Sequence, residues 1–251
     1  MKHAAVRFRP AACVVCAAPV RGRMENPHMQ DPRLDAVFLA YEKLVAQTDT
    51  LFGRVRDQFP AEVGCKAGCS DCCHAMFDLS LVEAMYINRK FNECFDFGAQ
   101  RSAILEAAGE ADRRATRLKR HYYQRARQGA SDEEIMREAG RDRIRCPLLG
   151  RDDTCLMYEF RPVTCRLYGV PTVIQGKGHV CGKCSFTPGK PYPTIQLDRI
   201  QDRLADMSRD IAAAVGSRFR ELHTVYVPLS MALLNKYDDA YLGVGEAPRE
   251  S

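Results

Sequence analysis

Residues 65–74 read Cys65-Lys-Ala-Gly-Cys69-Ser-Asp-Cys72-Cys73-His74, and four of these ten residues are cysteines. The spacing of Cys65, Cys69 and Cys72 suits a turn around one tetrahedral metal, because paired thiolate ligands typically stand a few residues apart. Gly68 stands where that turn must be tight. Cys72 and Cys73 are adjacent, and neighbouring side chains point in different directions. We therefore expect this pair to serve two metals or to bridge them.

More cysteines follow along the chain. Cys181-Gly-Lys-Cys184 is a second ligand pair, and three further cysteines occur at nearly regular separations between residues 146 and 165. Thiolates suit zinc and the iron of iron–sulfur clusters alike. Nine candidates could form two four-cysteine sites with one left over, and the spacing leaves the division and the metal open. The candidate ligands are Cys65, Cys69, Cys72, Cys73, Cys146, Cys155, Cys165, Cys181 and Cys184.

The distribution of cysteines indicates a reducing compartment. Ten of the twelve cysteines in this 251-residue chain lie from Cys65 to Cys184, which fits thiolate ligation better than a disulfide framework. A cytoplasmic location is expected. The net charge of +5 is mild and does not by itself imply nucleic acid. No run approaches the roughly 18 consecutive apolar residues of a membrane span, so no membrane partner is expected.

The two ends of the chain differ from its middle. A signal peptide would need a cleaner apolar run than residues 1–30 contain. We therefore expect these residues to be disordered or to precede the true start of translation at Met24 or Met29. Within them, Cys13 and Cys16 have the spacing of a further metal or redox pair. Residues 31–240 are expected to form one helical domain whose motif region covers 60–186. Residues 241–251 are expected to be a flexible tail.

Hydrophobic spacing predicts a mainly α protein. Apolar residues repeat at helical intervals from Leu34 to Val55, after a capping Asp31 and before Pro60. Further helices are expected from Ser80 to about Phe91, from about Asp96 into the basic stretch that ends at Arg120, from Ser131 to Ala139, from Leu197 to Phe219, and after Pro228. Short extended pieces are expected at 146–149 and 155–158, joined by a turn, and at 167–174. The predicted fold is a single helical domain with cysteine-rich metal-binding loops and a few short strands.

Several pieces resemble a known family in order. These are Cys65-x₃-Cys69-x₂-Cys72-Cys73, then Cys146-Pro-Leu-Leu, then Cys155-x-x-Tyr158-x-x-Arg161-Pro162-x-x-Cys165-Arg166. They resemble the YkgJ-type cysteine-cluster proteins, which carry a CxxCxxCC domain associated with zinc or iron chelation. The resemblance covers about half the chain and implies zinc or iron binding, or an iron–sulfur cluster such as 4Fe–4S, in a bacterial cytoplasmic protein. The pair Cys181 and Cys184, after a long loop, departs from the pattern.

Two arginines stand among the candidate ligands. Four thiolates around zinc leave a net negative charge, which Arg161 and Arg166 are expected to offset while donating N–H groups to sulfur. This interpretation depends partly on the resemblance, and an ordinary surface salt bridge is the alternative for Arg161. Pro162 is expected to fix the turn between Tyr158 and Cys165.

Three other residues near the motifs are weaker candidates. His74 and His179 each stand beside a candidate ligand, but a surface histidine is the commoner case. Cys94 lies between Phe91 and Phe95 on the apolar side of its helix, where a core cysteine is expected.

The sequence leaves three functions open. The leading prediction is a zinc- or iron-binding protein whose protein partner and biological role are not indicated. The second is a cluster-dependent enzyme, either redox or protein-modifying, since the flagellin lysine methylases resemble the same family; no common catalytic motif is present. The third is a zinc-stabilised nucleic-acid or protein-binding module using the basic run from Arg113 to Arg127. Its charges are spread around the helix, which favours a solvated face, so nucleic acid is not expected as a partner.

Overall fold

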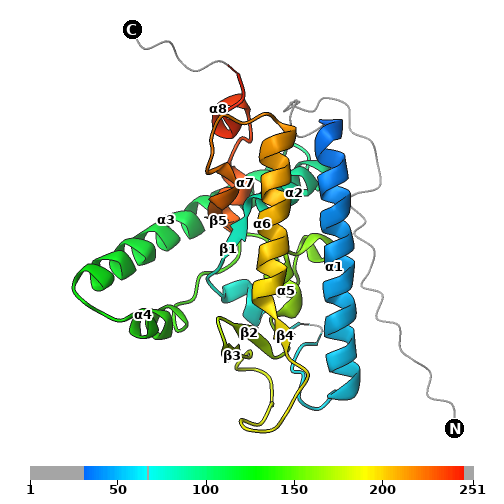
Figure 1. The fold of residues 1–251 in the computed structure, drawn as a ribbon, viewed down its shortest axis with the longest axis vertical. Coiled ribbons are helices and arrows are strands. Elements are labelled where there is room, and N and C mark those ends of the chain that lie inside the picture. Colours follow the sequence, from blue (N-terminus) through cyan, green and yellow to red (C-terminus); the bar gives the residue numbers. More distant parts are fainter. Residues whose placement is uncertain (1–30, 67, 246–251) are drawn as a thin grey trace, which may run out of the picture.

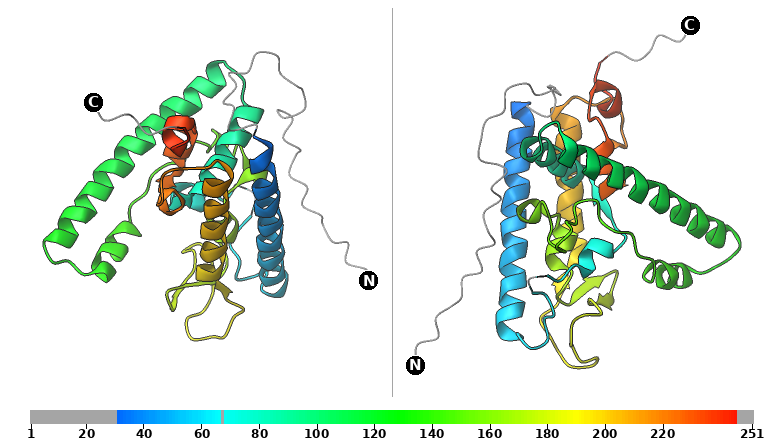
Figure 2. Two further views of the ribbon diagram at one scale, coloured as in Figure 1. Left: turned by 45° about the horizontal axis from the view of Figure 1, so that its top comes forward. Right: turned by 180° about the vertical axis from the view of Figure 1, so that it is seen from behind.

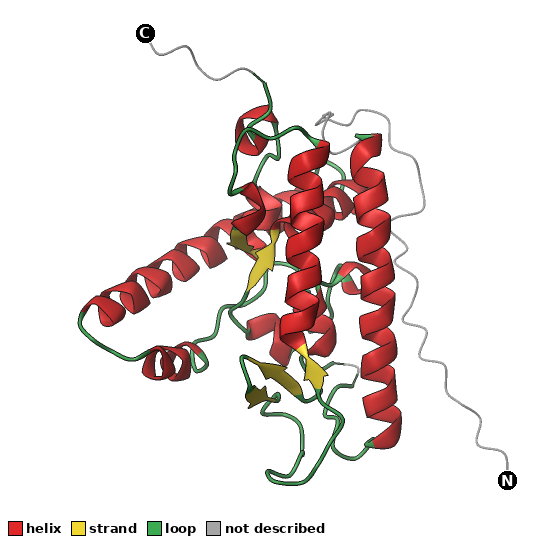
Figure 3. Cartoon of the chain, in the orientation of Figure 1, coloured by secondary structure: helices red, strands yellow, loops and turns green. Residues whose placement is uncertain are grey.

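The computed structural model describes residues 31–66 and 68–245, and it confirms a mainly α single domain (Figures 1 and 3). The predictions for residues 1–30, including Cys13 and Cys16, lie outside these residues. The helices are α1 (Pro32–Gln58), α2 (Leu81–Cys94), α3 (Ala99–Arg127), α4 (Asp132–Ala139), α5 (Val163–Leu167), α6 (Leu197–Ala214), α7 (Leu229–Leu234) and α8 (Asp239–Leu242). Within the described residues, no helix is both long and apolar enough to traverse a bilayer.

The hydrophobic core lies between α1, α2 and α6, which contact one another in pairs. Helix α1 buries Leu34, Phe38 and Leu44, and α6 buries Leu204 and Ile211, each at most 4% exposed. Leu34 and Phe38 lie four residues apart, and the two residues of α6 lie seven apart, so each helix presents one apolar face to the core. Burying such a side chain contributes about 1.5–3 kcal/mol. Figure 1 shows α1 and α6 running side by side in opposite directions. The segment that follows α1 and the segment that precedes α6 therefore lie near the same end of the molecule.

The predicted helix starts are confirmed. The Asp31 carboxylate accepts from the N–H of Arg33 at 2.9 Å, and capping boxes begin α2 at Ser80 and α4 at Ser131. The Glu83 carboxylate in the α2 box is only 3% exposed. Besides Ser80 it accepts from the N–H of Val163 at 3.0 Å, so it joins the starts of α2 and α5.

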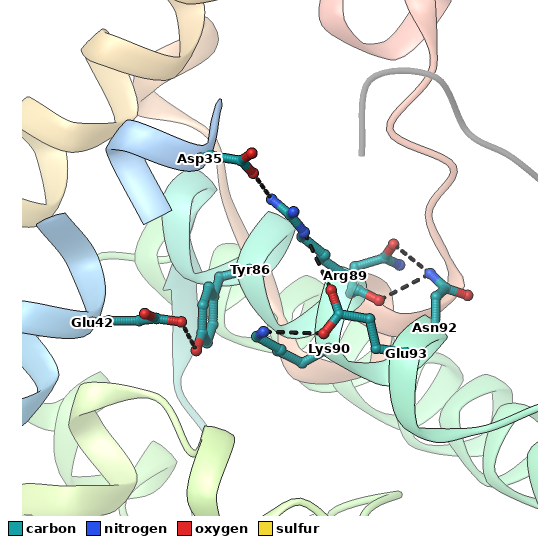
Figure 4. A network of polar contacts seen from close by, with 8 residues as sticks. Asp35, Glu42, Tyr86, Arg89, Lys90, Asn92 and Glu93 are labelled. Atoms are coloured by element: carbon teal, nitrogen blue, oxygen red, sulfur yellow. Dashed lines mark hydrogen bonds and ion pairs between the residues drawn. The ribbon is translucent and has the colours of Figure 1, made fainter. Parts of the chain in front are cut away.

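A polar network joins α1 to α2 at the surface (Figure 4). Arg89 lies 2.5 Å from Asp35, and the Tyr86 hydroxyl donates to Glu42 at 2.8 Å. Lys90 pairs with Glu93 at 3.0 Å. The charged groups of this network are therefore largely engaged with one another.

Helices α3 and α4 form an arm. The first part of α3 packs on α7, whereas its C-terminal half extends away from the α1–α2–α6 core, with α4 returning beside its far end (Figures 1 and 2). The chain then runs back to the cysteine-rich region, where the N–H of Ile144 donates to the carbonyl of His74 at 3.1 Å.

Two small sheets are present in residues 31–66 and 68–245. Strand β1 (Asp78–Ser80) pairs antiparallel with β5 (Tyr226–Pro228). In the other sheet, β2 (Thr172–Ile174) lies between β3 (Lys177–His179), which is antiparallel to it, and β4 (Ile195–Gln196), which is parallel. The part of the chain that the structure describes also contains the short 3₁₀ helices η3 (Asp71–His74), η4 (Tyr158–Phe160) and η5 (Leu222–Thr224).

The predicted extended pieces are partly confirmed. Leu149 and Cys155 form an antiparallel bridge, and the N–H of Gly150 donates to the carbonyl of Thr154 at 2.8 Å, so residues 146–156 make the expected hairpin. The strand predicted over 167–174 is wrong in its first part, because residue 167 ends α5 and the strand begins at Thr172. Pro162 caps α5 with φ −65°, a value that the proline ring imposes and that suits a helix start.

The C-terminal boundaries also differ from expectation. Helix α6 ends at Ala214 rather than near Phe219, because Gly216 adopts φ +65°, a left-handed conformation that ends helices. The tail expected from residue 241 is wrong for its first residues, since Leu242 is 0% exposed and belongs to α8. Residues 246–251 lie outside the described range.

Candidate metal centre

The nine candidate cysteines come from four segments that the fold brings together. These are the loop and 3₁₀ helix at 63–74, the hairpin at 146–156, α5, and the loop that holds Cys181 and Cys184. Helix α5 packs on α1, and β2 packs on α6; Figure 1 shows β2 and β4 at the N-terminal end of α6. Each of the nine cysteines is a free thiol.

Five sulfurs make a first group, which we call the inner group: Cys72, Cys73, Cys146, Cys155 and Cys165. The thiol of Cys72 is hydrogen-bonded to those of Cys73 and Cys165, and Cys73 is hydrogen-bonded to Cys146. Cys155 lies within electrostatic range of Cys146 and Cys72. The N–H of Cys146 also donates to the carbonyl of Cys73 at 2.7 Å. This backbone bond fixes the hairpin against η3.

Cys65, Cys69 and Cys184 lie beside the inner group, and with Cys181 we call them the outer group. Cys65 interacts electrostatically with Cys184, Cys69 and Cys72, so Cys72 adjoins both groups. The sulfur of Cys184 accepts from the N–H of Gly64 at 3.4 Å and donates to the carbonyl of Gly169 at 3.3 Å. Residues separated by more than a hundred positions therefore meet at this sulfur.

Two glycines permit this close approach. A Cβ at Gly169 would lie 2.0 Å from the sulfur of Cys65, and one at Gly64 would lie 2.1 Å from the carbonyl oxygen of Lys183. Both distances are far below van der Waals contact, so no larger residue fits without displacement. Gly68 adopts φ +81°, which confirms the tight turn predicted there. The roles of Gly64 and Gly169 were not foreseen, because they depend on tertiary contacts.

The turn at Cys181 and Cys184 is shaped by its own backbone. The N–H of Lys183 donates to the sulfur of Cys181 at 3.4 Å, and the N–H of Cys184 donates to the carbonyl of Cys181 at 3.0 Å. Backbone N–H groups directed at sulfur stabilise a thiolate and tune the metal that it binds. The second C-x-x-C pair therefore has the local geometry of a ligand turn.

Asp71 is a polar residue at this site that sequence reasoning missed. The thiol of Cys181 donates to the Asp71 carboxylate at 3.2 Å. The same carboxylate, whose side chain is 13% exposed, lies 3.5 Å from Arg143, which is also hydrogen-bonded to Tyr168. Its position directly before Cys72 was the only signal in the sequence.

Most of the thiols hold their protons more tightly than an isolated cysteine. Burial raises the pKa values of Cys65, Cys155 and Cys181 to about 12. The hydrogen bond to Cys72, with burial, raises the pKa of Cys165 well above its usual value. In contrast, bonds from Cys165 and Cys73 lower the pKa of Cys72 to about 3. The hydrogen bond from Cys73 also lowers the pKa of Cys146. The inner group therefore contains two favoured thiolates, Cys72 and Cys146, beside protonated neighbours whose protons a bound cation would have to displace.

Arg161 has the position expected for offsetting thiolate charge. Its positive charge lowers the pKa values of Cys65, Cys72 and Cys155, so it lies within range of both groups. Its Nε donates to the carbonyl of Tyr158 at 2.8 Å, and its guanidinium stacks 3.5 Å from the centre of the Tyr158 ring. These two contacts fix the direction of the charge.

Arg166 differs from the expected role. It is 7% exposed, and its Nη1 donates to Asp49 at 2.6 Å while its Nε donates to the carbonyl of Arg161 at 2.7 Å. Its Nη2 donates to the carbonyl of Glu159. All three nitrogens thus bind oxygen rather than sulfur. Arg166 holds the loop before Cys165 against α1 instead of contacting the candidate ligands.

The three weaker candidates occupy different surroundings. The Nδ1 atom of His74 lies 3.0 Å from the carbonyl oxygen of Ser70, a contact within its own turn. His179 is exposed in β3. Cys94 is 4% exposed in α2, so its burial is as expected, but it is disulfide-bonded and not the free core thiol that was predicted.

The donor set suits a thiophilic metal, because thiolates select zinc, copper(I) and iron–sulfur iron over hard cations. Across residues 31–66 and 68–245, no three His, Cys, Asp or Glu side chains are disposed around a common point as ligands. The inner sulfurs instead contact one another directly. The site is therefore described by proximity of thiols and not by a coordination polyhedron.

No protein-family model matches this chain, and no curated protein or solved structure is similar to it. The resemblance to the YkgJ-type proteins accordingly stays a prediction.

Proposed function

We propose that this chain binds zinc or iron through its cysteines, the iron either as an ion or within an iron–sulfur cluster. The observation that carries the proposal is the convergence of nine free thiols from four separate segments. Cysteines that serve only as small core residues have no reason to gather in this way. Soft sulfur donors in such number favour zinc or iron–sulfur iron.

We assign the sulfurs to two four-cysteine centres with Cys72 between them. One centre uses the other members of the inner group, which are Cys73, Cys146, Cys155 and Cys165. The second uses the outer group. The support for this division is that Cys72 interacts with Cys65 of the outer group as well as with Cys165 of the inner group. Cys72 would then either bridge the two centres as a shared ligand or remain beside them as an unligated thiolate with its own negative charge.

The bound metal is also proposed to stabilise the loops that supply its cysteine ligands. The described residues of the segments 60–75 and 140–190 form only short helices and strands, and these segments place many thiols at partly buried positions. Ligation gives such segments the cross-links that a small hydrophobic core does not supply. Arg161 would offset part of the negative charge of the loaded centres. A reducing, cytoplasmic location is part of the proposal, because thiolate ligands must stay unoxidised.

The test is metal analysis of protein purified without oxygen. Iron and acid-labile sulfide in similar amounts, with a brown absorption band, would identify an iron–sulfur protein. Colourless protein with one or two zinc ions per chain would identify zinc centres. A chain that holds no metal after reconstitution under either condition would contradict the proposal.

A further inference from the structure

The arm made by α3 and α4 carries the basic run, and the structure divides its charges into two kinds. Lys119 pairs with Asp78 at 2.7 Å, and Arg125 pairs with Glu138 at 3.0 Å. These two cations hold the arm to β1 and to α4. Both residues belong to the basic run of the sequence, and for this reason the positive charges of the whole run are spread around the helix.

Four of the other arginines lie along one face, which we call the arginine stripe: Arg113, Arg117, Arg120 and Arg127. Arg114 is also exposed but lies about 100° from Arg113 around the helix, outside the stripe. All four arginines of the stripe are exposed, and within the described residues none has an ion pair. At about 100° per residue, they fall within about 80° of one another around the helix and span about 21 Å along it. The stripe lies opposite the buried face of α3, which holds Ala111, Ala115 and Tyr122.

The position of the stripe makes it accessible. It occupies the half of α3 that extends away from the core (Figure 2), and α4 contacts the helix on another side, through Arg125 and His121. The apolar face of α3 is already in use against α7 and the core. A straight, cationic ridge on a projecting helix is therefore open along its whole length.

The chemistry of the stripe matches phosphate groups. Arginine presents a planar fork of donors that binds phosphate oxygens in pairs. A nucleic-acid strand carries one charge about every 3.4 Å, so the stripe is as long as roughly six phosphate steps. Tyr123 flanks it and is 66% exposed, which suits stacking on a base. An interface with another protein needs an apolar centre, and an in-plane membrane helix needs a free apolar face; the stripe has neither.

We infer that the arginine stripe binds the phosphate backbone of nucleic acid without preference for sequence. This binding surface is separate from the cysteines, so it goes beyond the proposed metal binding. The stripe supplies positive charge and paired N–H donors, and Tyr123 adds a stacking surface where bases are unpaired.

The test compares two variants of equal charge on the full, metal-loaded chain. In the stripe variant, Arg113, Arg117, Arg120 and Arg127 are each changed to Gln. In the control variant, the exposed residues Lys43, Arg54, Arg199 and Arg220 are changed to Gln instead. Each variant lowers the formal net charge of +5 by four, to +1. Circular dichroism and metal content establish that both remain folded.

Affinity is measured by fluorescence anisotropy with random-sequence single-stranded and duplex DNA at several salt concentrations between about 50 and 200 mM. The stripe variant is expected to bind at least about tenfold more weakly than wild type. The slope of its log affinity against log salt concentration should be smaller by an amount equal to the loss of two or more phosphate contacts. The control variant is expected to lose less than about threefold, because its charges lie elsewhere.

Three results would overturn the inference. The first is a wild-type chain that does not bind either form of DNA at about 50 mM salt. The second is equal weakening in the stripe and control variants, which would show only diffuse charge attraction. The third is binding of the wild-type chain to vesicles containing an acidic phospholipid, with no binding to nucleic acid. None of these measurements depends on which metal the cysteines hold, so they test the stripe independently of the proposed function.

Discussion

Gly169 lies so close to Cys65 that a Cβ at position 169 would stand 2.0 Å from the cysteine sulfur. The contact joins the segment after α5 to the start of the cysteine-rich loop. It also holds Cys65 near Cys184, whose sulfur donates to the carbonyl of this same glycine at 3.3 Å. Because Gly169 has no side chain, Cys65 and Cys184 of the outer group can both lie against its backbone.

Changing Gly169 to Ala is expected to displace Cys65. Overpacking of this kind typically costs about 1–3 kcal/mol, and the outer group should lose metal while the inner group keeps it. Thermal unfolding and metal content measure the two effects. Gly182→Ala is the matched control, because a Cβ there meets nothing within 4 Å. Equal behaviour of the two variants would show that the close contact at Gly169 is unimportant.

The two arginines of the motif are expected to act differently. Arg166→Lys should destabilise the fold by about 1–3 kcal/mol, since lysine cannot satisfy two carbonyls and Asp49 together. Arg161→Gln should leave the free energy of unfolding of the metal-free chain nearly unchanged but weaken metal binding, because positive charge near the thiolates is lost. Urea unfolding and chelator competition measure the two quantities. The reverse assignment of effects would contradict the roles derived from their contacts.

Glu83 is expected to give the stability a distinctive pH dependence. Burial raises the pKa of this carboxyl above its ordinary value of 4.5 in spite of the hydrogen bonds from Val163 and Ser80. A group whose pKa is raised on folding stabilises the native state most below its unfolded pKa, and that contribution is lost as pH rises through the folded pKa.

The measurement is the free energy of unfolding of wild type and Glu83→Gln from about pH 4 upward. The stability of wild type relative to the variant should fall as the pH rises above 4.5, and it should level off once the folded carboxyl has ionised. A difference between the two proteins that rises with pH would indicate that the hydrogen bonds outweigh burial. Ser131, whose capping box is exposed, supplies a control through Glu134→Gln, which should not reproduce this trend.

Metal affinity is expected to rise with pH. Burial raises the pKa values of Cys65, Cys155 and Cys181 to about 12, so these thiols are protonated at neutral pH until a metal displaces the protons. Each proton released makes the affinity about tenfold greater per pH unit. Titration of the metal-free chain with zinc in weak buffer should release more than two protons per ion. Release of fewer than one would contradict ligation by these thiols.

Much of the fold could be predicted, because it depends on local signals. Asp31, Ser80 and Ser131 start their helices through their own side chains or capping boxes, and apolar spacing defines the buried faces. The strand predicted over 167–174 failed where a distant residue decides the structure: the buried carboxylate of Glu83 accepts from the N–H of Val163 and favours a helix there.

The candidate site divides in the same way. The spacing of the cysteines indicates that they converge, but which sulfurs are neighbours depends on how η3, the hairpin and α5 pack. Gly169 and Asp71 could not be recognised, because a close approach or a bond to Cys181 leaves no mark in local sequence. Arg166 was expected to donate to sulfur because it stands among the candidate ligands and because of the family resemblance, whereas its guanidinium is directed to Asp49 on α1.

The most direct test of metal binding compares Cys155→Ser with Met157→Leu, measured as metal and acid-labile sulfide per chain after anaerobic purification. Cys155 lies in the hairpin, Met157 directly follows the hairpin, and Met157 is 2% exposed, so its conservative replacement controls for disturbance of the packing. The account predicts that wild type and Met157→Leu carry the same amount of zinc or iron, and that Cys155→Ser loses the metal of the inner centre. Equal metal content in all three proteins, or none in any of them, would contradict it.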